Sequence, residues 1–224
     1  MSAILFGSIS TLADTSELQR ESFNKAFATH DLGWTWSRDD YLEMLGASGG
    51  ADRIAAYAAS RDEQVDAQAV HLTKSQIFQE DIATAGISAR PDVAATIADA
   101  KEAGFKVGLV TTTSTQNVTA LLEALTPEVT AEMFDVIVDI TSVPDRKPAG
   151  DAYQHAVRSL GDDAAHCVAI EDNIDGVTSA QAAGIACVAF PNANTAEHDF
   201  SAAQQRVDRV QFSQLASMLP TDHA

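Results

Sequence analysis

The sequence predicts an α/β fold: a doubly wound parallel sheet that is interrupted after its first strand by a helical insertion. From residue 87 onward, short apolar runs alternate with amphipathic segments, which is typical of a parallel sheet with helices on both faces. One more apolar run, residues 3–6, lies near the N-terminus. Between these parts, about 70 residues have helical periodicity and no strand-like run.

The N-terminal third contains one expected strand and several expected helices. Residues 3–6 (AILF) are apolar throughout, as in a central parallel strand. From Thr15 to about Ala85, apolar side chains recur at helical spacing, with glycines at the breaks. We therefore expect residues 15–86 to form a helical cap, and residues 1–14 and 87–224 to form the α/β core.

The remaining chain is expected to alternate helices with strands. The first of these helices, in residues 90–104, has Pro91 in its first turn and Gly104 past its end. The later helices are expected at residues 115–125, 151–161 and 175–184. The matching strands are expected at residues 105–111, 134–140, 166–172 and 185–190.

The composition limits the classes of partner. Thirty-two acidic residues against 14 basic ones give a net charge of −18, which argues against nucleic acid and anionic membranes. No apolar run reaches the roughly 18 residues of a membrane span, and no signal peptide is recognisable. Cys167 and Cys187 lie in apolar runs, so we expect free thiols and a cytoplasmic location.

Polar side chains gather where the expected strands end. Because parallel strands share one carboxyl edge, the loop at residues 7–11, the hydroxyl run at residues 111–114, Lys147 and the pair Glu171–Asp172 should lie together. Each also has a structural explanation: a hydroxyl or a carboxylate can cap the next helix, and a lysine can lie on the surface. Their joint occurrence at the strand ends favours a ligand-binding crevice.

This combination resembles the haloacid dehalogenase (HAD) superfamily of phosphotransferases, and within it the CbbY-type xylulose bisphosphate phosphatases. The resemblance is carried by TLADTSELQRESFNKAF, GGADRI, VTTTSTQNV, RKPAGDAY and IEDNIDGVTSAQAAGI. It implies phosphate binding by Thr111, Thr112 and Lys147, and Mg²⁺ binding by Glu171 and Asp172.

The first loop departs from the family pattern. The family has Asp-x-Asp-Gly-Thr there, with the first aspartate as the nucleophile and the second as the general acid and base. In this sequence Gly7 and Ile9 occupy those two positions, so neither catalytic aspartate is present. Ser8 and Ser10 are hydroxyls, but a serine nucleophile needs an adjacent base. We therefore expect Mg²⁺ binding to be weak or absent.

The expected cap also differs from the family. A family lysine that grips a second phosphate is replaced by Ala51, and a family histidine is replaced by Gln19. The resemblance still implies substrate contacts through four residues: Glu17, Arg20, Arg53 and Arg90.

The hypothesis that follows is a pseudophosphatase that binds a phosphorylated metabolite or inorganic phosphate, or that acts through a protein partner. One alternative is an active Mg²⁺-dependent phosphatase, or other chemistry, that uses the non-standard loop. The other is a structural or interaction protein with a vestigial crevice. In each of these cases, Lys147 lacks the nucleophilic aspartate that balances its charge in the family. It should therefore pair with Glu171, with Asp172 or with a bound anion.

Overall fold

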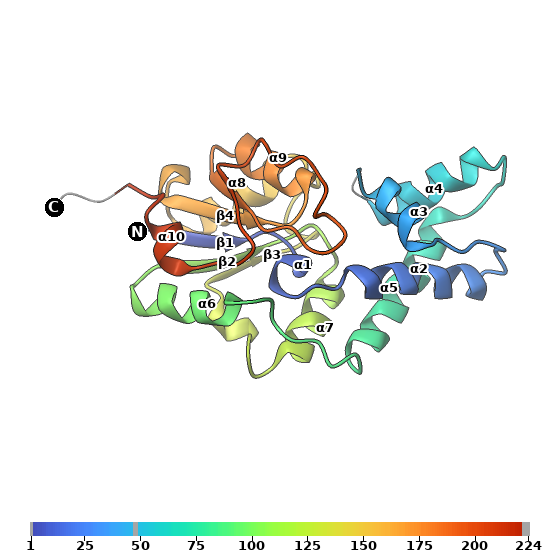
Figure 1. Cartoon of the computed structure of the whole chain (residues 1–224), viewed down its shortest axis with the longest axis horizontal. Helices are drawn as coiled ribbons and strands as arrows, with labels where there is room; N and C mark the ends of the chain where they lie inside the picture. Colours follow the sequence, from blue (N-terminus) through green and yellow to red (C-terminus); the bar gives the residue numbers. More distant parts are fainter. Residues whose placement is uncertain (1, 47–48, 221–224) are drawn as a thin grey trace.

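The computed structural model describes residues 2–46 and 49–220, and within them it has a six-stranded parallel sheet (Figure 1). The strands are β1 (Ala3–Phe6), β2 (Lys106–Val110), β3 (Val136–Val138), β4 (Cys167–Glu171), β5 (Ala186–Ala189) and β6 (Gln205–Arg206). Their order is β3-β2-β1-β4-β5-β6, so β1 lies inside the sheet between β2 and β4. The expected α/β fold is confirmed.

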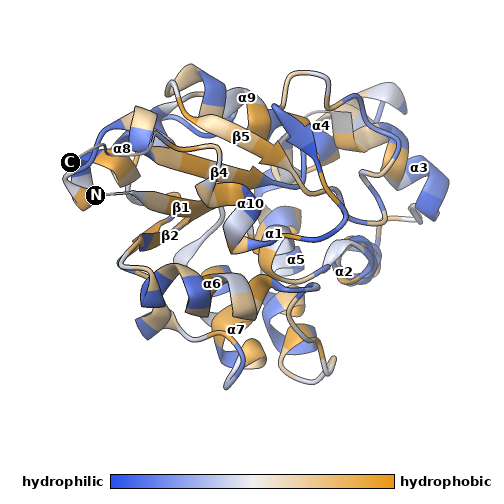
Figure 2. Cartoon of the chain, turned by 60° about the vertical axis from the view of Figure 1, so that its left-hand side comes forward, coloured by the Kyte–Doolittle hydropathy of each residue, from blue (hydrophilic) through white to orange (hydrophobic). Residues whose placement is uncertain are grey.

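Helices cover both faces of this sheet because alternate strand residues point to opposite sides. Ile4 and Phe6 belong to one apolar cluster with α6 (Val93–Glu102), α7 (Thr115–Leu125) and α10 (Phe212–Ala216). Ala3 and Leu5 belong to a second cluster with α8 (Asp151–Leu160) and α9 (Ile174–Ala182). In Figure 2 the central strands are accordingly hydrophobic between these helices. Ligands therefore reach the sheet at its carboxyl edge.

The helices inserted after β1 form a separate lobe, on the right in Figure 1. They are α2 (Ser16–Thr29), α3 (Arg38–Glu43), a 3₁₀ turn (Met44–Gly46), α4 (Gly50–Ser60) and α5 (Ala67–Ile82). Their own apolar cluster includes Phe23, Phe27 and Trp36, with ring centroids 4.6 Å apart for Phe27 and Trp36. The end of α5 instead packs in the core cluster through Phe78 and Ile82, so the proposed cap shares this helix with the core.

Local details differ from the expected elements. The helix expected within residues 90–104 begins only at Val93, because Asp92 has a φ of 66° and cannot continue a helix through Pro91. The first loop contains a short helix that was not expected, α1 (Ile9–Leu12), and β6 and α10 were not expected either. Residues 47–48 of the expected cap lie outside the described residues. None of the helices in the described ranges is both long and apolar enough to cross a membrane.

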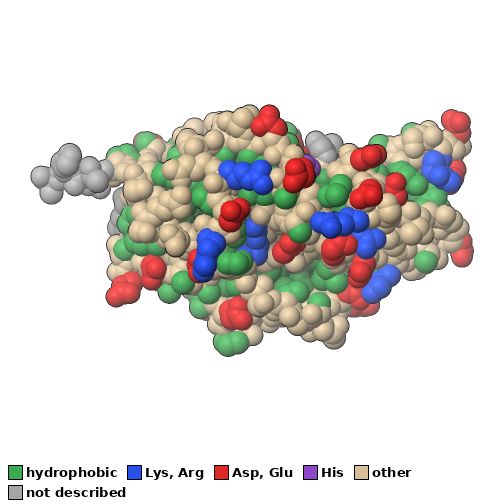
Figure 3. Space-filling model, viewed as in Figure 1, with side chains coloured by type: hydrophobic (Ala, Val, Ile, Leu, Met, Phe, Trp, Pro, Cys, Tyr) green, Lys and Arg blue, Asp and Glu red, His purple; other side chains and the backbone are tan. Residues whose placement is uncertain are grey.

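Charged side chains are mixed over the surface. On the face shown in Figure 3, Lys and Arg side chains are interspersed with Asp and Glu side chains. Several exposed cations have acidic partners: Lys25 Nζ lies 2.7 Å from an Asp81 oxygen, and Arg209 Nε lies 2.6 Å from an Asp92 oxygen. In the part of this face that the structure describes, the basic groups do not form one continuous surface for a polyanion.

Candidate functional site

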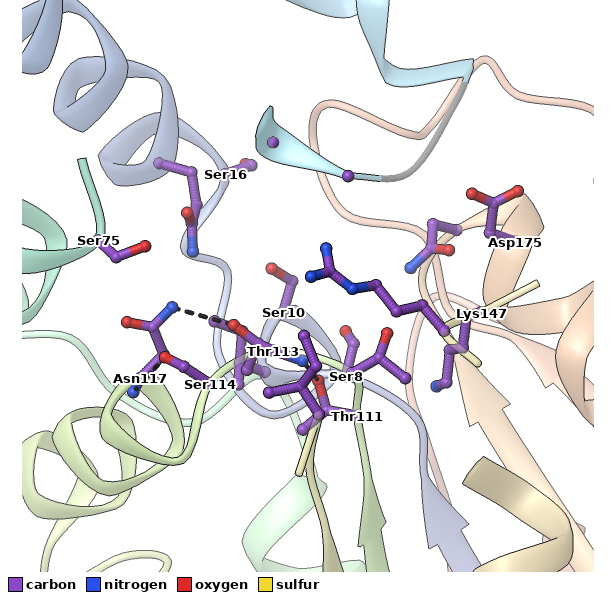
Figure 4. A pocket seen from close by; sticks show the side chains of 18 of the residues that line it. Ser8, Ser10, Ser16, Ser75, Thr111, Thr113, Ser114, Asn117, Lys147 and Asp175 are labelled. Carbon is purple, nitrogen blue, oxygen red and sulfur yellow. Dashed lines mark hydrogen bonds between the residues drawn. The ribbon is translucent and has the colours of Figure 1, made fainter. Parts of the chain in front are cut away.

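A cavity of about 680 Å³ lies between the carboxyl edge of the sheet and the cap. Its core wall comes from the first loop, the residues after β2, Lys147 and Asp172, and its cap wall from α2, α4 and α5. Figure 4 shows Ser8 from the first loop near Thr111 and Thr113 from the end of β2, with Lys147 beside them. The strand-end groups expected to meet are therefore together.

The first loop carries hydroxyls but no carboxylate. Gly7 extends β1 by donating its N–H to Ile170 O (2.8 Å). Ser8 caps α1 by accepting from Thr11 N (3.1 Å), and its hydroxyl donates to Asp172 Oδ1 (2.6 Å). Ile9 is 7% exposed, and its aliphatic side chain cannot carry a proton. The loop thus lacks both an acidic nucleophile and a general acid.

Lys147 is paired with Glu171 inside the protein. The Lys147 ammonium, 7% exposed, lies 2.5 Å from Glu171 Oε1 and also donates to Val110 O (2.7 Å) and to Gly7 O. Tyr153 donates its hydroxyl to the same Glu171 oxygen (2.8 Å). The expectation that Lys147 pairs with a neighbouring carboxylate is confirmed, and the partner is Glu171.

The Glu171 side chain is held in a fully buried position. Its relative exposure is 0%, and Oε2 is buried without a hydrogen-bond partner. Burial raises the pKa of the Glu171 carboxyl, and the Lys147 ammonium opposes that rise. Burial likewise raises the pKa of the Tyr153 hydroxyl, so this group stays a donor to Glu171.

The Glu171 carboxylate lies where a side chain at position 7 would begin. A Cβ added to Gly7 would come within 2.1 Å of Glu171 Cδ and within 2.5 Å of the Tyr153 hydroxyl. Both distances are far below van der Waals contact. The present arrangement of Glu171 therefore requires a residue without a side chain at position 7.

Asp172 is satisfied by neutral donors. Its Oδ1 accepts from Ser8 (2.6 Å) and from Asn173 Nδ2 (2.9 Å), and its Oδ2 accepts from Asn192 Nδ2 (2.8 Å). Mg²⁺ needs several oxygen ligands in near-octahedral arrangement. Because Glu171 Oε1 is engaged by Lys147 and both Asp172 oxygens by these donors, the residues as placed do not supply the set of oxygen ligands that Mg²⁺ needs. No group of three or more His, Cys, Asp or Glu suited to a metal occurs among residues 2–46 and 49–220.

The hydroxyls after β2 have two roles. Ser114 caps α7 by accepting from Asn117 N (3.3 Å), so the structural alternative holds for this residue. Thr111 is 5% exposed and accepts from Thr113 N (3.2 Å). Thr111 and Thr112 both line the cavity beside Lys147, as a phosphate site requires.

Of the four expected substrate contacts, Arg53 is the one that lines the described cavity wall. Its guanidinium lies 5.5 Å from the centroid of the Tyr41 ring, which also lines the cavity. Glu17 and Arg20 instead pair with each other at 2.9 Å, and Glu17 accepts from Asn194 Nδ2 (3.2 Å), which links the cap to the core.

Arg90 is placed away from the described cavity wall. It donates to Ser10 O (3.2 Å), to Phe190 O (2.8 Å) and to Pro191 O, and its guanidinium lies 3.3 Å from the centroid of the Phe190 ring. It therefore ties the first loop to the loop after β5.

Sequence reasoning missed the contribution of α5. His71, Ser75 and Gln79, four residues apart, all line the cavity from this helix. This polar spacing was the available signal. Burial, together with the positive charges of Lys74, Arg146 and Arg53, lowers the pKa of His71 to about 4. The imidazole is therefore neutral near pH 7.

Comparisons with known proteins identify the family of the chain. A family model described as haloacid dehalogenase-like hydrolase matches residues 1–184. Protein CbbY of Cereibacter sphaeroides is 36% identical over 225 residues, with 98% of this chain and 96% of that protein covered. A CBBY-like protein of Arabidopsis thaliana is 32% identical over 221 residues, with 93% of this chain and 69% of that protein covered.

Solved structures lead to the same family. The crystal structure of CbbY from Rhodobacter sphaeroides in complex with phosphate superposes with a TM-score of 0.87 at 35% identity, covering 98% of this chain and 99% of that one. A mutant of CbbY from the same organism, in complex with xylulose-(1,5)bisphosphate, gives the same TM-score and identity over 99% and 100% of the two chains. The chain belongs to the haloacid dehalogenase-like hydrolase family and is similar to CbbY over almost its whole length.

Proposed function

We propose that this chain binds a phosphorylated small molecule in its cavity without hydrolysing it. The observation that carries the proposal is the first loop, where Gly7 and Ile9 stand at the positions of the family's two aspartates. Attack on phosphorus needs an activated nucleophile, and release of the leaving group needs a proton donor. The space beside Gly7 is taken by Glu171, which is paired with Lys147 and does not belong to the described lining of the cavity.

The ligand class is proposed from the groups that remain. Thr111, Thr112 and Lys147 adjoin the cavity on the core side, and Arg53 adjoins it on the cap side. In a chain with a net charge of −18, such local cations favour an anionic ligand. The similar CbbY structures hold phosphate in one case and xylulose-(1,5)bisphosphate in the other. We propose that this binding requires no Mg²⁺.

A second candidate is slow hydrolysis with Ser8 as the nucleophile. The 2.6 Å hydrogen bond from Ser8 to Asp172 favours it, because Asp172 could then act as the base. Asp172, however, also accepts from Asn173 and Asn192, so both of its carboxylate oxygens are already engaged by amide donors.

One pair of assays separates these proposals. Phosphate release is measured on p-nitrophenyl phosphate and on sugar mono- and bisphosphates with Mg²⁺, and thermal stability is measured with the same compounds. We expect no release above the buffer blank, and a higher melting temperature with at least one compound, since a ligand at 100 times its Kd adds about 2.7 kcal/mol. Release that is lost in Ser8→Ala would establish the second candidate. If no compound releases phosphate and no compound raises the melting temperature, the result would favour a vestigial crevice.

We also propose a cytoplasmic location. Cys167 and Cys187 are both buried free cysteines, as expected in a reducing compartment. Burial raises the pKa of the Cys167 thiol to about 12, so it stays protonated and unreactive. Fractionation of the source cells would test this location.

A further inference from the structure

We infer that Glu171 replaces the carboxylate missing from position 7: it acts as a built-in counter-ion of Lys147 and thereby weakens the binding of a phosphate group at that lysine. The inference deepens the proposed function and rests on it, because it describes what controls anion binding in the same cavity. It concerns a contact within this chain and involves no metal ion.

The first step is that Lys147 needs a negative partner. Its ammonium is 7% exposed and is surrounded by main-chain carbonyls of Gly7 and Val110. A buried ammonium without a counter-ion is strongly destabilising. Glu171 supplies that counter-ion at 2.5 Å.

The second step is that the position of Glu171 is built by two glycines. A Cβ added to Gly7 would lie 2.1 Å from Glu171 Cδ, and a Cβ added to Gly176 would also lie 2.1 Å from Glu171 Cδ. The carboxylate therefore lies between two positions that carry no side chain. A carboxylate on residue 7 and the present Glu171 conformation exclude each other, so an acidic side chain at position 7 requires the Glu171 side chain to move.

The third step concerns a bound phosphate. Thr111 and Lys147 border the same end of the cavity, so a phosphate placed there would be repelled by the Glu171 charge just behind it. Glu171 thus weakens anion binding at Lys147 while it stabilises the fold. Neutralising Glu171 should therefore strengthen anion binding at Lys147 and lower the stability of the fold.

A double-mutant cycle tests the exchange of carboxylates. Glu171→Gln removes the Glu171 counter-ion from Lys147, and Gly7→Asp brings a second carboxylate into the space that Glu171 occupies, so each single change should lower the melting temperature. The double variant again has one carboxylate beside Lys147, and it should be more stable than the sum of the two losses predicts. As a control, Gly33→Asp adds the same charge where a Cβ meets nothing within 4 Å, and it should combine additively with Glu171→Gln.

Calorimetry with inorganic phosphate, without Mg²⁺, tests whether Glu171 weakens phosphate binding at Lys147. Glu171→Gln should bind phosphate at least about tenfold more tightly than the unmodified chain, and adding Lys147→Met should remove the gain. If Glu171→Gln does not fold alone but the variant that combines it with Gly7→Asp does, the exchange of carboxylates is supported directly. The inference would be overturned if neither Glu171→Gln nor its combination with Gly7→Asp folds, or if the stability changes in the cycle are additive. It would also be overturned if Glu171→Gln binds phosphate as tightly as the unmodified chain or more weakly.

The two proposals fail in different ways. Phosphate release by the unmodified chain would refute the proposed function, and it would leave the stability cycle as it stands. An additive cycle without any phosphate release would refute only the role of Glu171.

Discussion

Arg90 should act on stability and not on ligand affinity, although the family resemblance implies a substrate contact. In the structure its guanidinium donates to three main-chain carbonyls and stacks on Phe190 at 3.3 Å. Hydrogen bonds with a charged partner contribute about 1.5–3 kcal/mol each. A cation–π contact adds about 0.5–2 kcal/mol. Because the site is only partly buried and water can replace some of these bonds, we expect Arg90→Ala to cost about 4 kcal/mol.

Urea denaturation measures this loss, and two variants serve as controls. Arg90→Lys keeps the charge, but one ammonium cannot serve three carbonyls in fork geometry, so it should cost about half as much. Arg20→Ala removes an exposed ion pair with Glu17 and one bond to Trp36 O (3.0 Å), and should cost about 1 kcal/mol.

The affinity measurement decides between the two roles of Arg90. The folded fraction of Arg90→Ala should bind phosphate within about twofold of the unmodified chain, because the guanidinium lies off the described cavity wall. A stability change below about 0.5 kcal/mol together with a tenfold loss of phosphate affinity would refute the reasoning and make Arg90 a ligand contact.

Three further predictions concern the cavity and the cap. Titration calorimetry of the unmodified chain should show no Mg²⁺ binding tighter than about 10 μM, since a full oxygen ligand set is lacking; tighter binding contradicts the geometry of the site. Gly7→Asp with Ile9→Asp should release phosphate from p-nitrophenyl phosphate in the presence of Mg²⁺, about 10²–10⁴-fold faster than Gly7→Asp alone; equal rates would show that the retained groups are misaligned. Lys74→Met should stabilise the protein by about 4 kcal/mol below pH 7, because Lys74 is 4% exposed and burial together with Arg53 lowers its pKa to about 7. The folded pKa lies below the unfolded value of about 10.4, so the native chain loses stability as the pH falls from 10 to 7, and the advantage of the variant should disappear near pH 10; a pH-independent difference in the urea midpoint would count against this account.

Much of the fold could be predicted because its signals are local. The strand at residues 3–6 and the helix at residues 115–125 were expected with the bounds that the structure has. The start of the helix expected within residues 90–104 was predicted too early because of a single backbone angle. Asp92 adopts a left-handed conformation, and the helix starts after it. The short strand β6 (Gln205–Arg206) has no apolar run and exists only because it pairs with β5.

The meeting of the site residues could also be predicted, although their contacts could not. Thr111, Lys147 and Asp172 follow strand ends, and parallel strands bring those ends to one edge. Neither the partner of each group nor the side chains that α5 adds to the cavity follow from this rule. Arg90 illustrates the limit, because the carbonyls that it binds lie 80 to 101 residues away in the sequence.

The sequence by itself determined that this chain has the α/β architecture and that its first loop lacks both acidic groups, since these properties depend on periodicity and on residue identity. Only the tertiary structure decided which carboxylate neutralises Lys147. Glu171 and Asp172 are adjacent in the sequence, and either could have paired with the lysine. The choice depends on the absence of side chains at Gly7 and Gly176, which leaves space that the longer Glu171 side chain fills, and on the amide and hydroxyl donors that already hold Asp172. Packing of segments more than 160 residues apart creates that volume, and no local pattern encodes it.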